Sequence, residues 1–153
     1  PAKEIPLLVM HLIKNKLDFI SCNRLPFEDP KKMSIVRSFG VRILNGLILI
    51  LYGYKIKDSL SGMWIFKRYV YNELQLTEGG WNFSLEIKLK TIADSRFKFS
   101  EKQISYHDRV FDSSKQNILR TGVEHVFYLF SLKKSLLGIL KFDFKLKYNF
   151  KRD

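Results

Sequence analysis

Apolar residues recur at helical spacing along several stretches of the chain. Over residues 3–16 they fall three or four positions apart, as in Ile5, Leu8 and Leu12, which predicts an amphipathic helix. Four further helices are predicted from apolar runs and from residues typical of helix ends. They cover residues 34–52 with Ser34 as N-cap and Gly53 after the end, 67–74, 82–93 with Asn82 or Ser84 as N-cap, and 113–140 with Ser113 or Ser114 as N-cap.

Three short apolar runs separate these helices and predict β-strands. They cover residues 17–22, 62–66 and 97–107, the last of which alternates only loosely between apolar and polar residues. Residues 23–32 contain Pro26 and Pro30 and predict a loop. The alternation of helices and strands predicts an α/β fold in which helices pack on a sheet of three or so strands.

The C-terminal segment has a pattern of its own. From Leu140 to Tyr148 apolar and polar residues alternate strictly, and residues 133–153 hold seven basic side chains against two acidic ones. Continued as a helix, this segment is basic and surface-seeking, whereas as a strand it has one apolar face. A solvated, charged terminus is the third alternative. We therefore expect residues 1–125 to form the main domain and residues 126–153 a basic amphipathic segment.

The charge of the chain narrows the choice of partners. Its 153 residues include 27 Lys or Arg and 15 Asp or Glu, for a net charge of +12. This excess implies an anionic partner, which is a nucleic acid, a lipid headgroup or a phosphorylated substrate. The sequence has no basic recognition helix, zinc finger or RRM-type motif, so a nucleic acid is the least expected of the three.

The sequence gives no sign of secretion or of a membrane-spanning segment. Residues 1–4 do not start a secretory leader, which has a basic stretch followed by an apolar run. The longest apolar run, residues 47–54, is shorter than the roughly 20 residues that a spanning helix needs. Cys22 is the single cysteine, which excludes an intramolecular disulfide and favours a reducing compartment.

Several kinds of site chemistry find no support in the sequence. Neither of the usual Gly-rich loops that cradle nucleotide phosphates is present. The three histidines, His11, His107 and His125, lack the spacing of metal ligands, and there is no Asp-x-Asp pair to hold a divalent cation. We therefore expect no metal site in this chain.

Four segments resemble motifs of glycosyltransferase family 2, in the same order and at similar spacing. Asp58-Ser-Leu-Ser-Gly-Met-Trp-Ile-Phe-Lys-Arg68 resembles Asp-x-x-Ser-Gly-Phe-Arg-x-Phe-Arg-Arg, and Ile104-Ser-Tyr-His-Asp-Arg-Val-Phe-Asp-Ser-Ser-Lys115 resembles Ile-x-Tyr-x-x-Arg-x-x-Gly-x-Ser-Lys. Gly80–Lys88 is similar to the start of a Gly-x-x-Phe-x-x-Glu helix, and Phe19–Arg24 to a strand ending in Gly-Ser-Arg. The motifs cover roughly residues 1–125 and are most similar to those of the polyprenyl- or dolichyl-phosphate sugar transferases.

The resemblance implies the C-terminal portion of a GT-A glycosyltransferase domain, a Rossmann-like α/β fold, without its N-terminal nucleotide-binding half. The implied reaction moves a sugar from a nucleotide diphosphate to a polyprenyl or dolichyl phosphate at the cytosolic face of a membrane. The family uses Mg2+ or Mn2+, and its Asp-x-Asp ligands precede the segment that residues 1–6 resemble, so the ligands are expected outside this chain. The chain alone is therefore expected to be inactive.

The resemblance also implies which residues bind the two phosphate-bearing substrates. Arg24 and Arg37 match positions that the family uses around the acceptor phosphate, and a planar guanidinium suits phosphate oxygens. Arg109, Ser114 and Lys115 match the segment that closes over the donor diphosphate. Positive charge there stabilises the departing nucleotide, so Arg109 is also an expected catalytic residue.

Asp58 is the second expected catalytic residue. A lipid phosphate is largely ionised near neutral pH, so we expect Asp58 to orient the acceptor phosphate, with capping of a turn as the alternative. Ser61 and Gly62 belong to the same motif, and a tight turn into a strand is their alternative role. Glu86 is expected on the acceptor side, or else paired with Lys90 on one helix face.

Two readings from other classes stay open at this point. One is a non-catalytic, basic module that binds lipid or a membrane surface and keeps only the acceptor half of the transferase. The other is a basic α/β domain that binds nucleic acid.

Overall fold

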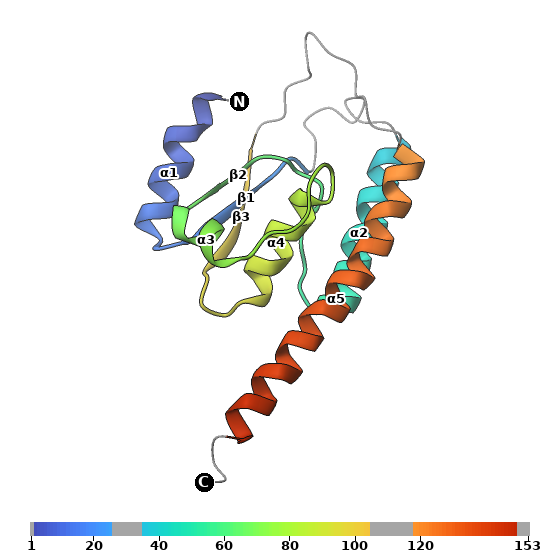
Figure 1. The fold of residues 1–153 in the computed structure, drawn as a ribbon. Helices are drawn as coiled ribbons and strands as arrows, with labels where there is room; N and C mark the ends of the chain where they lie inside the picture. Colours follow the sequence, from blue (N-terminus) through green and yellow to red (C-terminus); the bar gives the residue numbers. More distant parts are fainter. Residues whose placement is uncertain (1, 26–34, 105–117, 150–153) are drawn as a thin grey trace.

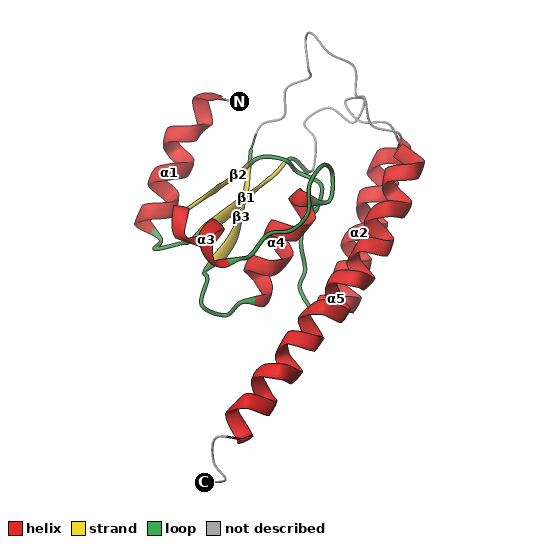
Figure 2. Cartoon of the chain, in the orientation of Figure 1, coloured by secondary structure: helices red, strands yellow, loops and turns green. Residues whose placement is uncertain are grey.

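The computed structural model of the 153-residue chain describes residues 2–25, 35–104 and 118–149 (Figure 1), and for residues 35–37, 118–119 and 139–149 it describes the backbone alone. Helices and strands alternate along the chain and form a mixed α/β fold (Figure 2). This confirms the α/β class that the sequence predicts.

The sheet has three strands in the order β2-β1-β3. The central strand β1 (Phe19–Asn23) runs antiparallel to β2 (Trp64–Phe66) and parallel to β3 (Phe99–Gln103). All five residues of β1 are buried, because strands and helices cover it on every side. The ring of Phe19 stacks between its two cross-strand partners, with centroid distances of 5.6 Å to Phe66 and 5.4 Å to Phe99.

The first four helices lie close to the predicted ranges, whereas the last extends further toward the C-terminus. The helices are α1 (Ile5–Lys14, preceded by a 3-10 turn at Ala2–Glu4), α2 (Ile35–Tyr52), α3 (Arg68–Glu73), α4 (Phe83–Ala93) and α5 (Ile118–Asn149). Gly53 follows α2 with φ +69°, the left-handed conformation that favours glycine at a helix end. Gly53 therefore ends this helix as predicted.

Two helical layers enclose the sheet. On one face α1 packs Leu8 and Leu12 against Ile20 and Cys22 of β1. On the other face α3 and α4 pack, through a cluster of Phe19, Val70, Leu74, Ile87 and Phe97.

The pair α2 and α5 forms a further layer, on the side of α4 that faces away from the sheet. The two helices lie side by side and contact one another (Figure 1). The shared core with α4 consists of buried leucines and isoleucines: Leu44, Ile48, Ile56, Leu85, Leu89, Leu129 and Leu132.

The C-terminal segment is helical. The backbone of α5 continues through Asn149, beyond the predicted end near Leu140, so the strict alternation from Leu140 to Tyr148 does not form a strand. In the described ranges no helix combines the length and apolar character needed to cross a membrane.

Candidate functional site

Arg24 and Asp58, which lie 34 positions apart in the chain, form an ion pair at the carboxyl end of β1. The guanidinium donates from Nε to Asp58 Oδ2 at 2.8 Å and from Nη2 to Oδ1 at 3.0 Å. The Arg24 backbone N–H adds a third bond to Oδ2 at 3.2 Å. Asp58 is fully buried, whereas the Arg24 side chain is 24% exposed. The structure thus brings two of the predicted site residues together, with the cation partly open to solvent.

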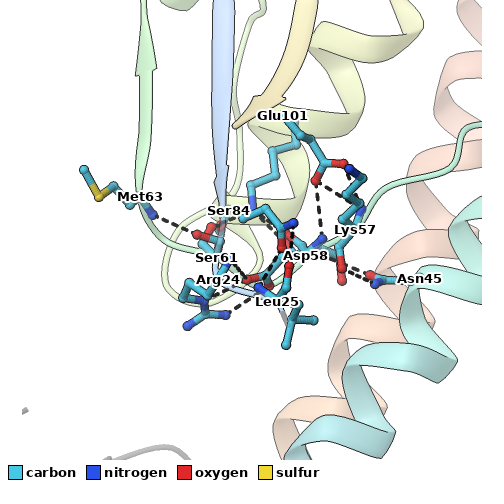
Figure 3. A network of polar contacts seen from close by, with 12 residues as sticks. Arg24, Leu25, Asn45, Lys57, Asp58, Ser61, Met63, Ser84 and Glu101 are labelled. Atoms are coloured by element: carbon cyan, nitrogen blue, oxygen red, sulfur yellow. Dashed lines mark hydrogen bonds and ion pairs between the residues drawn. The ribbon is translucent and has the colours of Figure 1, made fainter. Parts of the chain in front are cut away.

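The end of β1 is braced so that Arg24 leaves the strand in a fixed direction. The side chain of Asn23 accepts from the backbone N–H of Leu25 at 2.8 Å and donates to its carbonyl at 2.8 Å. These two bonds close a small ring across Arg24, and Figure 3 shows the Arg24 side chain directed toward Asp58. Such side-chain-to-backbone bonds are a common property of asparagine in turns.

Asp58 begins a turn that leads into β2. The N–H of Ser61 donates to the Asp58 carbonyl at 3.4 Å, and the Ser61 hydroxyl accepts from the N–H of Met63 at 3.4 Å. Met63 then pairs through its carbonyl with the N–H of Cys22 in β1. Ser61 is buried and Gly62 is exposed, and both lie between the turn and the start of β2 at Trp64.

Two side chains from distant elements clamp the backbone on the other side of Asp58 (Figure 3). Asn45 of α2 donates to the Lys57 carbonyl at 2.7 Å and accepts from the Ser59 N–H at 3.2 Å. Glu101 of β3 accepts from the N–H groups of Lys57 and Asp58 at 2.9 to 3.3 Å. Burial raises the pKa of Glu101 above its usual value, against the effect of these hydrogen bonds.

Lys88 is a site residue that the sequence analysis missed. Its side chain is fully buried, and Nζ donates to the carbonyls of Ser59 at 2.9 Å and Ser61 at 2.5 Å, with the Asp58 carbonyl at 3.4 Å. Burial lowers the pKa of Lys88 to about 8. The available signal was its position, three residues after Leu85 on the apolar face of α4, where a lysine is unexpected.

Glu86 lies in a different cluster. Its carboxylate accepts from the N–H and hydroxyl of Thr77 and from the N–H of Glu78, at 2.8 to 3.1 Å, and pairs with Lys90 at 2.7 Å. Although burial pushes the pKa of Glu86 upward, hydrogen bonds from Lys90, Thr77 and Glu78 hold it below its usual value. None of its hydrogen bonds in the described ranges reaches Asp58, so the alternative pairing with Lys90 is confirmed.

Neither predicted side-chain cap of α4 forms. Asn82 stands at the N-cap position without a capping hydrogen bond, because its Oδ1 lies 2.9 Å from Nδ1 of the buried His125 on α5. Ser84 lies inside the helix and donates instead to the Ser61 carbonyl at 3.0 Å. The prediction of a side-chain cap was therefore wrong, since both side chains hold α4 to neighbouring segments.

The remaining predicted site residues are not seen as side chains. Arg37 lies in the first turn of α2, where only the backbone is described. Arg109, Ser114 and Lys115 lie outside the described residues, as do the N-cap candidates Ser34 and Ser113. The residue before the 105–117 segment, Ile104, donates its N–H to the carbonyl of Asn23 at 2.9 Å. Ile104 therefore lies beside the residue that precedes Arg24.

The other candidate groups of the sequence have packing or local roles. Trp64 contacts Phe66 and Phe83 edge to face within the sheet cluster. His11 bonds to the side chain of Asn15, and burial raises the pKa of Cys22 to about 11. Across the described ranges no three His, Cys, Asp or Glu side chains are grouped to hold a metal ion.

Comparisons with family models, with curated proteins and with solved structures give no significant match for this chain. The interpretation of the site therefore depends on its own geometry and on the sequence motifs.

Proposed function

We propose that this chain is the acceptor-side, C-terminal part of a family 2 glycosyltransferase with a GT-A fold. The complete enzyme moves a sugar from a nucleotide diphosphate to a polyprenyl or dolichyl phosphate at the cytosolic face of a membrane. In this proposal residues 1–125 belong to the transferase domain. The expected boundary at residue 125 falls inside α5, whose Leu129 and Leu132 still pack in the core with α2 and α4, so the basic amphipathic segment continues a helix of that domain.

The ion pair between Arg24 and Asp58 is the observation that carries the proposal. Two of the four motifs that resemble the family contribute one residue each, and these residues meet although they are far apart in sequence. A third motif begins at Ile104, which is bonded to Asn23 next to Arg24. Convergence of residues from two motifs at one end of the central strand is expected of a shared site, and ligand sites of α/β sheets lie at the carboxyl ends of strands.

The chemistry of the pair suits a phosphate-bearing acceptor. Arg24 presents a planar guanidinium that already holds an oxyanion in the two-point geometry that phosphate also accepts. The buried carboxylate of Asp58 fixes the plane of the guanidinium, and 24% of the Arg24 side chain is exposed. Asp58 thus acts by orienting Arg24, and the ionised acceptor phosphate supplies its own nucleophilic oxygen.

The described side chains provide no ligand set for the divalent cation that is expected for the family. No acidic group of the required kind is present there, and the sequence has no Asp-x-Asp pair. We therefore derive no step of the reaction through a metal. Arg109, Ser114 and Lys115 are proposed to neutralise the donor diphosphate from the 105–117 segment.

The proposal is tested by sugar transfer in the complete gene product. Detergent-solubilised protein with Mg2+ or Mn2+ is given radiolabelled UDP- and GDP-sugars and a short polyprenyl phosphate, and labelled lipid is counted. Arg109→Ala is expected to abolish transfer and leave folding intact. Arg96→Ala is the matched control, because Arg96 is an exposed arginine paired with Asp94 and Glu73 away from the site. Absence of transfer in the wild type, or equal transfer in Arg109→Ala, contradicts the proposal.

One observation favours the second candidate, a non-catalytic module that binds a membrane surface. Large apolar side chains are exposed along one side of α2 and of α5, with Ile50 79% and Phe127 72% exposed. On α5 they share their helical spacing with Arg120 and Lys134, so apolar and basic groups lie on the same side. Among the side chains that the structure describes on these two helices, the exposed large apolar ones are Phe39, Ile43, Leu49, Ile50, Val123, Phe127, Phe130 and Leu137.

Vesicle binding together with transfer separates the two candidates. Both predict sedimentation with vesicles that contain phosphatidylglycerol, weakened by Phe127→Ser but not by Tyr71→Ser, a control at an exposed aromatic residue of α3. Only the transferase predicts labelled lipid. Vesicle binding by a complete gene product that never transfers sugar favours the module.

A further inference from the structure

The buried lysine of α4 has an unusual set of partners. Lys88 Nζ faces the main-chain carbonyls of Asp58, Ser59 and Ser61, at 3.4, 2.9 and 2.5 Å. An ammonium group has three protons to donate and no lone pair to accept with. Three carbonyls therefore match its full donor capacity, which offsets the large free-energy cost of burying the charge.

These partners belong to one turn, and none of them is a carboxylate. Buried lysines are ordinarily paired with an acidic side chain. The charge of Lys88 is instead directed at the backbone oxygens of residues 58–61, which converge on Nζ from one side. A cation at this position holds the carbonyls of the turn together, because without it their partial negative charges repel one another.

The same turn carries the carboxylate that pairs with Arg24. On its outer side the backbone is held by Asn45 and Glu101, and on its inner side Ser84 and Lys88 both donate to the Ser61 carbonyl. We infer that Lys88 is the positioning residue of the Arg24–Asp58 pair and acts through the backbone of the turn. The inference rests on the proposed function for the identity of the ligand, a phosphate-bearing acceptor.

The charge of Lys88 responds to pH in the range that can be measured on the folded protein. Burial is the main cause that lowers its pKa to about 8, and the charged or titratable groups acting on it are Asp58, Arg24, Glu101 and Cys22. Below pH 8 the ammonium has three protons for the three carbonyls. Above pH 8 the neutral amine has two, so the turn loses a hydrogen bond and its buried positive charge.

A pair of lysine variants tests the positioning role. In the 15N-labelled full chain, the Nε–H signal of Arg24 reports the bond to Asp58, and its hydrogen exchange with water is slowed by that bond. Lys88→Met is expected to accelerate this exchange about tenfold or more, toward the rate in Asp58→Asn. Lys90→Met is the matched control, since Lys90 lies two residues further along α4 and bonds to Glu86 and the Gln75 carbonyl. A folded Lys88→Met protein with the wild-type Arg24 signal overturns the inference.

A titration of the wild-type chain decides the question even where Lys88→Met does not fold. The Arg24 Nε–H signal is expected to shift with a midpoint near pH 8, together with the Lys88 side-chain signal. The Arg96 signal is the internal control, because its partner Asp94 is remote from Lys88. An Arg24 signal that stays constant while the Lys88 side-chain signal titrates overturns the inference. Both measurements omit sugar nucleotide and lipid, so their outcome is independent of whether transfer occurs.

Discussion

Replacing Asp58 with asparagine removes the charge that Arg24 binds and keeps the size of the side chain. Removal of one partner from a buried ion pair typically costs about 3–5 kcal/mol of stability. Arg24 is 24% exposed, so water solvates part of the uncompensated guanidinium, and the asparagine oxygen still accepts one hydrogen bond. We therefore expect Asp58→Asn to lower the free energy of unfolding by about 2–3 kcal/mol.

Urea unfolding measures this loss directly. With a urea dependence of about 2 kcal/mol per molar for a small protein, the midpoint is expected to fall by about 1–1.5 M. Asp94→Asn is the matched control, because Asp94 pairs with the exposed Arg96 and surface pairs contribute little. If Asp58→Asn lowers the urea midpoint by no more than Asp94→Asn does, the view that the Arg24–Asp58 pair is a strong, fixed part of the site is refuted.

Three further predictions concern the scaffold. Lys67 and Tyr69 bind the Asp18 carboxylate and hold its pKa at about 2 despite burial. The ionised carboxylate therefore contributes roughly 2 kcal/mol to the free energy of unfolding at neutral pH, and this contribution is lost as pH falls from 4 to 2. The gap in urea midpoint between wild type and Asp18→Asn is expected to close over that range, and a constant gap contradicts this. Leu129→Ala is expected to lower the free energy of unfolding by about 2–5 kcal/mol, because Leu129 is fully buried where α5 meets α2 and α4. Thermal or urea unfolding measures this loss, and a loss below about 1 kcal/mol contradicts the packing. Gly53→Ala is expected to lower the free energy of unfolding by about 1 kcal/mol. The cause is the positive φ of residue 53 alone, since no atom crowds the added methyl group, and an unchanged urea midpoint contradicts the left-handed helix end.

The elements of the fold were largely predictable because each has a local signal. The apolar spacing of residues 3–16 and the glycine after Tyr52 fix α1 and the end of α2 within the sequence itself. Extension of α5 to Asn149 was only one of three alternatives, because the period-two pattern from Leu140 onward also suits a strand. Among the described residues the strands all belong to the sheet β2-β1-β3, and helical hydrogen bonds within the segment satisfy its backbone groups.

The candidate site was predictable only where a motif pointed to it. Arg24 and Asp58 were expected near one phosphate, but their direct pairing depends on the strand order β2-β1-β3, which local patterns do not determine. Lys88 was missed because its partners are backbone carbonyls, which leave no mark in the sequence of the turn. Glu86 matched a motif position and also stood four residues before Lys90; the structure shows the pairing with Lys90 on one helix face, together with the bond from Thr77.

The most direct test of a phosphate site at Arg24 is a binding titration of the 153-residue chain with farnesyl phosphate and with farnesol, followed by tryptophan fluorescence in dilute detergent. The two ligands share their apolar chain, so their difference isolates the phosphate. We predict that the wild-type chain binds farnesyl phosphate at least about tenfold more tightly and that Arg24→Gln loses this preference. Equal affinity for the two ligands, or a preference that Arg24→Gln retains, contradicts the account.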